Sequence, residues 1–248
     1  IYLLLFLLLL QAFDEMTGQM ERLLEGVAVF MKALLPAYYI ALTGACGVAT
    51  ATAFYQMILI LIFLTEKILL LFLLPIRMYL VLELINFLTK EEFLSKMTEL
   101  LKNGILWALK SMIGVIVGIQ LIQRMISPAV DTLKRSVIGR TAGAIPGVGN
   151  LFSGVTEVVL GSAVLIKNGL GAAAIVILLL AGAAPLCRMG ISALAYQFLA
   201  AVVQPVTDKR MVGCIHTMGE SLGLLVRLLL TMEILFLLTI AILAGSLQ

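Results

Sequence analysis

The sequence has very little charge for its size. Only 12% of its 248 residues are Asp, Glu, Lys or Arg, whereas 62% are hydrophobic, and the mean hydropathy is +1.15. Soluble domains average about 45–50% apolar and about 25% charged residues. No soluble fold has enough interior to hide so much apolar surface. We therefore expect an all-α, polytopic membrane protein rather than a β-barrel, because the apolar runs are continuous instead of alternating.

Residues that carry metal or nucleophilic chemistry are also scarce. The chain has three cysteines and one histidine, without CxxC or Cys/His ligand spacing. No HExxH, paired acidic or Ser/His/Asp pattern is present, and His216 is interpreted as an ordinary loop histidine. The GAIPGVGN segment has the look of a phosphate loop but lacks its Gly-Lys-Ser/Thr ending. These absences predict no enzyme activity, no cofactor and no metal site. The net charge of +3, without a basic tract interleaved with aromatics, argues against nucleic acid as a partner.

Breaks in the apolar pattern predict about six to eight membrane segments. We expect Glu66-Lys67 to form a tight turn, and Pro185 with Arg188 to separate a pair of spans. Residues 89–103 carry an amphipathic pattern typical of a helix in the membrane interface, and 207–220 a second polar link. The predicted domains are 1–26 as a truncated apolar segment with an acidic link, 27–123 as a first membrane repeat, 124–140 as a basic linker, and 141–248 as a second repeat.

An internal duplication is indicated by the prolines. Pro36 and Pro75 have the same spacing as Pro146 and Pro185, and small residues recur at matching places. An acidic segment near the N-terminus and the basic segment 124–140 favour opposite sides of the membrane. That requires 27–48 to be a broken or re-entrant helix, and the halves to be inverted. Inverted repeats with broken helices are typical of transporters and channels.

A stripe of small and polar residues marks the stretch 136–171. A helix from Pro146 onward would place these residues on one face. Packing against another helix is one interpretation of this face, and the lining of a polar path is the other. The stripe comprises Pro146, Gly147, Asn150, Gly154, Glu157 and Gly161.

Three charged residues fall inside apolar segments: Glu157, Arg227 and Glu233. A charge in hydrocarbon is costly, so each must face protein, water or a counter-ion, or be neutralised. Arg227 and Glu233 are too far apart around a helix to pair with each other, so we expect partners on other helices. Structural pairing or snorkelling and a proton or ion relay both stay open.

The central stretch resembles the stage III sporulation protein AE family. The similar features are an Asp followed by Thr-Leu-Lys, an aliphatic-Pro-x-x-Gly turn at 145–149, and a helix ending in Leu-Ile-Lys-Asn. Further matches are FMKALLPAYY at 30–39, Ala-Pro-Leu at 184–186 and QPVTDKR at 204–210.

The resemblance implies a multi-pass protein of the mother-cell membrane in endospore-forming Firmicutes. It further implies a place in a secretion-like channel complex between mother cell and forespore. Other membrane subunits, a cytosolic ATPase and the lipid bilayer would be its partners. The expected function is a non-enzymatic membrane component of that complex, required for forespore development. The alternative is a stand-alone secondary transporter that uses Glu157 or Glu233 to carry a coupling ion.

Overall fold

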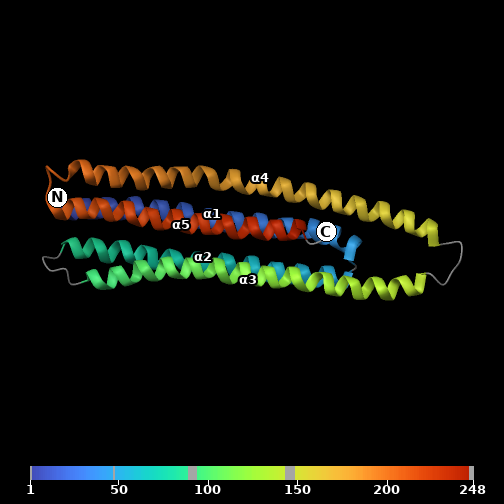
Figure 1. The fold of residues 1–248 in the computed structure, drawn as a ribbon. Helices are drawn as coiled ribbons and strands as arrows, with labels where there is room; N and C mark the ends of the chain where they lie inside the picture. The colour runs from blue at the N-terminus through green and yellow to red at the C-terminus, as the bar shows by residue number, and fades with distance from the viewer. Residues whose placement is uncertain (1, 47, 89–93, 143–148, 246–248) are drawn as a thin grey trace. The chain divides into compact units, whose positions relative to one another are not determined.

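Five long α-helices make up the portion of the chain that the computed structural model describes (Figure 1). That portion is residues 2–46, 48–88, 94–142 and 149–245, and the side chains of 44–46, 50, 88, 120–142, 149–168 and 245 lie outside the description. The helices are α1 (Tyr2–Cys46), α2 (Val48–Leu88), α3 (Ser95–Ala142), α4 (Gly149–Val203) and α5 (Lys209–Gly245).

All five helices are long and apolar enough to cross a membrane. They contain 37 to 55 residues, whereas about 20 residues at about 1.5 Å per residue cross the hydrocarbon layer. Each helix can therefore hold a full span and additional turns. The predicted all-α class is confirmed, with helices long and apolar enough to span a membrane. The count of six to eight segments and the internal repeat stay predictions.

The turn predicted at Glu66-Lys67 is wrong, because both residues lie inside α2. Neighbouring residues on a helix point about 100° apart. Glu66 is accordingly buried at 7% exposure, while the Lys67 side chain is 55% exposed and its Nζ lies 3.5 Å from the Glu66 carboxylate. A continuous helix therefore lets Glu66 face the interior and Lys67 the outside. The two spans expected on either side of this pair form a single helix.

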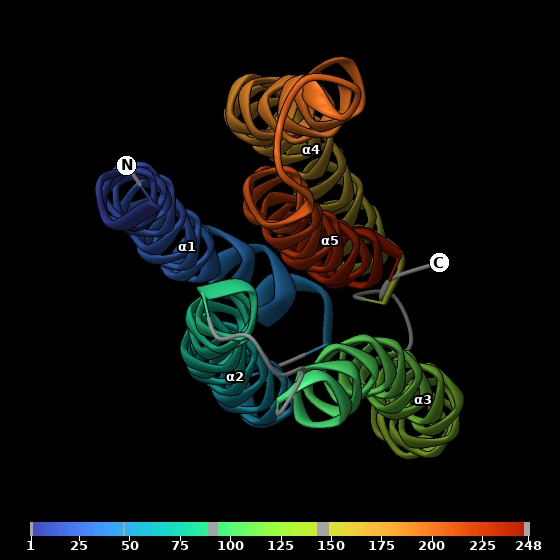
Figure 2. The same cartoon turned by 90° about the vertical axis from the view of Figure 1, so that its left-hand side faces the viewer.

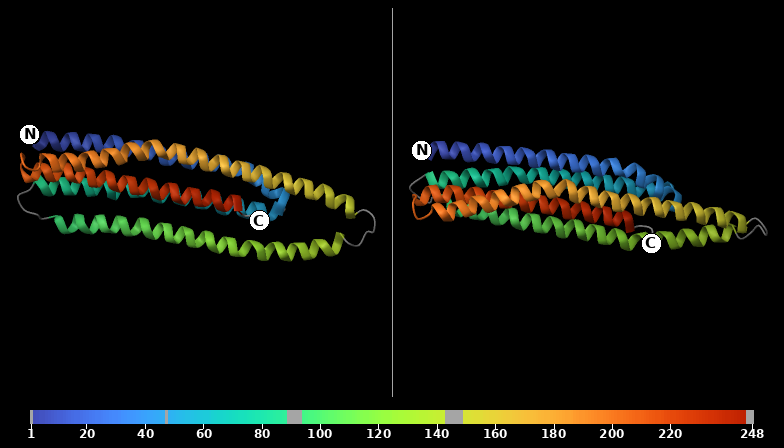
Figure 3. Two further views of the ribbon diagram at one scale, coloured as in Figure 1. Left: turned by 45° about the horizontal axis from the view of Figure 1, so that its top comes forward. Right: turned by 90° about the horizontal axis from the view of Figure 1, so that it is seen from above.

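Proline does not break the helices as expected. Pro36 lies inside α1, Pro75 inside α2 and Pro185 inside α4. The break predicted around Pro36 and the two spans predicted around Pro185 are therefore wrong, because the described residues 27–46 and 149–203 each form continuous helix (Figure 3). A proline removes one helical hydrogen bond, and long apolar membrane helices tolerate this where neighbouring groups compensate.

Much of the expected polar links is helical as well. The acidic link near the N-terminus belongs to α1, residues 95–103 of the amphipathic segment form the start of α3, and 124–140 lies within α3. Residues 209–220 open α5, so the predicted loop position of His216 is wrong too. The division of the chain into two repeats is untouched by these findings and stays a prediction.

The helices contribute to two compact units, each made from separated segments of the chain. The first unit comprises 1–28, 64–113 and 179–234, and the second comprises 29–63, 114–178 and 235–248. In the first unit successive helices alternate in direction (Figure 1). Figure 2 looks onto the end where α1 begins and α4 passes into α5.

The first unit is built around α5. Apolar side chains recur along α5 at helical spacing and are completely buried, namely Met218, Leu222, Leu225, Leu228, Leu229 and Met232. Burial of one such side chain contributes about 1.5–3 kcal/mol relative to water. In contrast, α4 turns a stripe of large apolar side chains outward, including Leu180, Ile191, Leu194 and Phe198 at 67–72% exposure. An outward apolar stripe of this kind is expected against lipid or another subunit.

The second unit contains a small aromatic contact between α1 and α2. The rings of Tyr39 and Tyr55 meet edge to face at 5.6 Å between centroids, and Tyr39 shares a hydrogen bond with Thr52 at 3.2 Å. Tyr38 is buried beside Gly171, where an added Cβ would lie 3.0 Å from its hydroxyl. Gly171 thus allows α4 to approach α1 closely.

Candidate functional site: a polar cluster and a buried carboxyl in the first unit

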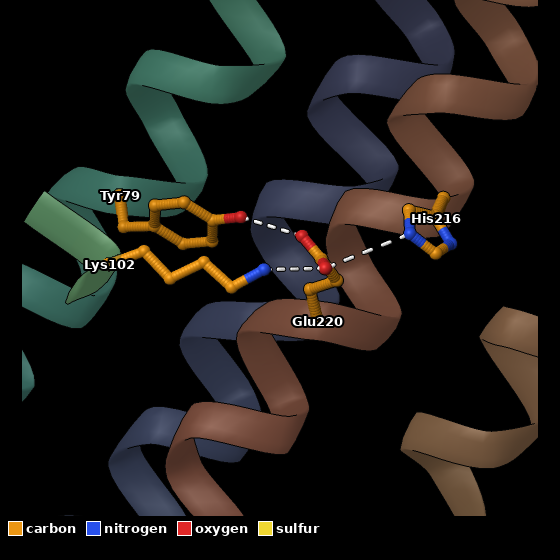
Figure 4. A network of polar contacts seen from close by, with 4 residues as sticks. All are labelled: Tyr79, Lys102, His216 and Glu220. Atoms are coloured by element: carbon orange, nitrogen blue, oxygen red, sulfur yellow. Dashed lines mark hydrogen bonds and ion pairs between the residues drawn. The ribbon is translucent and has the colours of Figure 1, made fainter. Parts of the chain in front are cut away.

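Glu220 of α5 binds side chains from two other helices (Figure 4). The Tyr79 hydroxyl of α2 donates to Oε2 at 2.8 Å, and the Lys102 ammonium of α3 donates to Oε1 at 2.6 Å. His216, one turn earlier on α5, places Nε2 3.8 Å from Oε1. Hydrogen bonds to ionised groups are short and about twice as strong as neutral ones. The Glu220 cluster (Tyr79, Lys102, His216 and Glu220) therefore fixes α2 and α3 to α5.

Helical spacing explains how the cluster is presented. His216 and Glu220 are four residues apart, so they share one face of α5. The same spacing on α2 places Glu83 beside Tyr79, and one oxygen of Glu83 is buried without a hydrogen-bond partner. The Glu220 and Lys102 side chains are 28% and 33% exposed, so the pair is only partly shielded from solvent.

Two further polar contacts hold α1 in the first unit. The guanidinium of Arg77 on α2 donates to Asp14 on α1 at 3.0 Å, with side chains 55% and 45% exposed. The Tyr2 hydroxyl, at the start of α1, donates to Asp208 just before α5 at 2.6 Å. Both contacts lie at the surface of the unit. An exposed ion pair such as Arg77–Asp14 contributes about 0–1 kcal/mol.

Glu233 is a buried carboxyl of the first unit. It is 7% exposed, and both carboxyl oxygens are buried without a hydrogen-bond partner. It lies against Gly182 of α4, where any added Cβ would collide with the carboxyl group. Arg227, in contrast, is exposed. Glu233 does not pair with Arg227, and among the described residues it has no hydrogen-bond partner on another helix.

Two other glycines allow helices to touch in this unit. The ring of Phe87 on α2 occupies the space beside Gly213 of α5. An added Cβ at Gly219 would lie 3.0 Å from the Ala193 carbonyl oxygen of α4. Small residues thus bring helix backbones together, which is the packing role that was expected for glycines elsewhere in the chain.

Most of the residues that the sequence singled out lie where side chains are not described. Pro146 and Gly147 fall in 143–148, outside the described residues. The backbone of α4 includes Asn150, Gly154, Glu157 and Gly161, but their side chains are outside the description. The choice between helix packing and path lining for this stripe stays open. Among the described residues, no group of three His, Cys, Asp or Glu side chains is placed to hold a metal ion.

The Glu220 cluster was missed by the sequence interpretation. The sequence pattern predicts Glu220 at the end of a polar link and Lys102 in an interfacial helix. The available signal was the pairing of His216 with Glu220 at helical spacing next to an apolar span. The contribution of α2 and α3 had no signal, because it depends on tertiary packing.

Comparison with known proteins identifies the family. The family model described as stage III sporulation protein AE matches residues 1–246. This chain belongs to the stage III sporulation protein AE family. Stage III sporulation protein AE of Bacillus subtilis (strain 168) is 24% identical over 252 aligned residues, which cover 100% of this chain and 63% of the relative. The chain thus spans less than two thirds of that relative's length. No solved structure matches.

Proposed function

We propose that this chain is a non-enzymatic, integral component of a secretion-like channel complex that joins mother cell and forespore during sporulation. The observation that carries the proposal is the family match over residues 1–246, together with the five helices able to span a membrane among the described residues. The proposed location is the mother-cell membrane around the forespore. The proposed partners are other membrane subunits of the complex, its cytosolic ATPase and the surrounding lipid, with no nucleic acid.

The outward faces of the helices support a role as a subunit. Large apolar side chains are exposed on α3 and α4, among them Trp107 at 72% and Phe198 at 72%. Apolar patches of this size mark lipid-facing or subunit-facing surfaces. The Glu220 cluster is suited to hold the helices of the first unit in register while these faces contact neighbours.

A secondary transporter is the second candidate, and Glu233 is the observation that favours it. Ionisable residues buried within membrane helices often bind protons or ions. The two candidates differ in what Glu233→Gln and Glu157→Gln should do. A coupling carboxyl should lose function while the protein still assembles normally. A packing residue should either tolerate the change or lose assembly.

The experiment is complementation of an endospore-forming bacterium whose own copy has been deleted. We expect the wild-type chain, within its full-length protein, to restore heat-resistant spores and forespore development after engulfment. Glu220→Gln, which removes a partly buried contact between helices, should lower the yield of heat-resistant spores more than Arg77→Met, which removes an exposed one. Normal sporulation of the deletion strain would contradict the proposal. Uptake of a solute by the purified protein alone would favour the transporter.

A further inference from the structure

The carboxyl of Glu233 lies beside a weakened place in the α4 backbone. It packs against Gly182, and neither of its oxygens has a hydrogen-bond partner. Three residues after Gly182, α4 continues through Pro185. Proline has no backbone N–H, so the carbonyl four residues earlier, that of Ala181, loses its helical partner. Ala181 directly precedes Gly182, the residue that the Glu233 carboxyl packs against.

Neighbouring groups do not satisfy Glu233. The hydroxyls of Thr231 and Thr239 on α5 donate to backbone carbonyls of their own helix, those of Arg227 and Leu235. The nearest charged residues along the two helices are Arg227 on α5 and Arg188 on α4, and both are exposed. An ionised carboxylate facing a carbonyl would place two acceptors together without a donor. Such an arrangement is costly in an apolar setting, where every polar group needs a partner.

A proton on Glu233 would remove the charge of the buried carboxyl and supply a donor for the Ala181 carbonyl. We propose that Glu233 binds a proton and donates it to the Ala181 carbonyl, which forms a proton-binding site between α4 and α5. Loss of the proton would leave a buried anion against a carbonyl, so α4 and α5 would have to separate or admit water. Release of the proton is therefore coupled to the contact between these helices. The site goes beyond the proposed role in sporulation and does not depend on any partner subunit.

The test uses dicyclohexylcarbodiimide, an apolar reagent that modifies protonated carboxyl groups in membranes. The full-length protein is reconstituted in phosphatidylcholine vesicles, treated at neutral pH, digested and mapped by mass spectrometry. Glu220 serves as the internal control, because it is ion-paired with Lys102 at 2.6 Å. We expect modification of Glu233 to exceed that of Glu220 by about tenfold or more, since an ion pair favours the charged form.

Two variants make the test specific. Glu233→Gln keeps the size of the side chain and a donor for the Ala181 carbonyl, so it should fold normally and lose the modification. Pro185→Ala restores a backbone N–H for the Ala181 carbonyl, so modification of Glu233 should fall severalfold. The proposal is overturned if Glu233 stays unmodified while exposed carboxyls such as Glu21 react. Protection of Glu233 from modification by sodium chloride would instead identify a bound cation. If Pro185→Ala leaves the modification of Glu233 unchanged, the Ala181 carbonyl is not part of the site.

Discussion

Removing the Lys102 ammonium tests whether the Glu220 cluster holds the first unit together. Lys102→Met keeps the length of the side chain but deletes the donor that lies 2.6 Å from Glu220. A hydrogen bond to a charged group contributes about 1.5–3 kcal/mol. Because both side chains are about one-third exposed, solvent screening places the expected loss at the lower end, about 1.5–2 kcal/mol. For a chain of this size that corresponds to a fall in Tm of about 3–8 °C.

The assay is thermal unfolding of the detergent-solubilised protein, followed as the fraction that remains monodisperse after heating. Arg77→Met is the matched control, because the Arg77–Asp14 pair is about half exposed and should contribute about 0–1 kcal/mol. A double-mutant cycle of Lys102→Met with Glu220→Gln measures the coupling directly. If the Lys102 and Arg77 variants lower Tm equally, or the coupling energy is close to zero, the Glu220 cluster does not fix α2 and α3 to α5.

Two further contrasts follow from the packing of α4 against α5. Gly219→Ala should destabilise by about 1–3 kcal/mol, because its Cβ would lie 3.0 Å from the fixed backbone carbonyl of Ala193. Gly190→Ala, with nothing within 4 Å of the new Cβ, should be neutral or stabilise by up to about 1 kcal/mol, and thermal unfolding separates the two. Maleimide labelling of the native protein in mild detergent, mapped by mass spectrometry, should modify the exposed Cys187 and spare the buried Cys214. Equal Tm shifts or equal labelling would contradict this packing.

The membrane class followed directly from composition, but the number of helices did not. Glu66-Lys67 indicates an interruption because a charge pair is costly inside the hydrocarbon layer, and the prolines do so because each lacks a backbone N–H. In the structure Glu66 turns into the first unit and Lys67 turns out of it, so the helix continues. A residue pattern that predicts a break does not show how much apolar packing lies on either side of it, and this packing can keep the helix continuous. About 20 residues are sufficient for a span. Because the helices contain 37–55 residues, they also include segments that the sequence pattern predicts to be links.

The candidate site was only partly predictable. An apolar stretch with one carboxylate marked Glu233, which does not pair with Arg227. The absence of a partner for Glu233 depends on what α4 presents at Gly182, which periodicity along α5 cannot reveal. The Glu220 cluster joins residues from α2, α3 and α5 that are as much as 141 positions apart. Helical periodicity shows which residues share one face of a helix. Which helix packs against that face is determined by the tertiary fold.

Purification of the tagged full-length protein from membranes of sporulating cells tests the central claim most directly. Membranes are solubilised in mild detergent, and proteins bound to the tag are identified by mass spectrometry and compared with those from vegetative cells that express the same protein. A subunit of a channel complex should recover other sporulation membrane proteins and a cytosolic ATPase, from sporulating cells alone. Recovery of a lone monomer from both kinds of cell would contradict the proposed function.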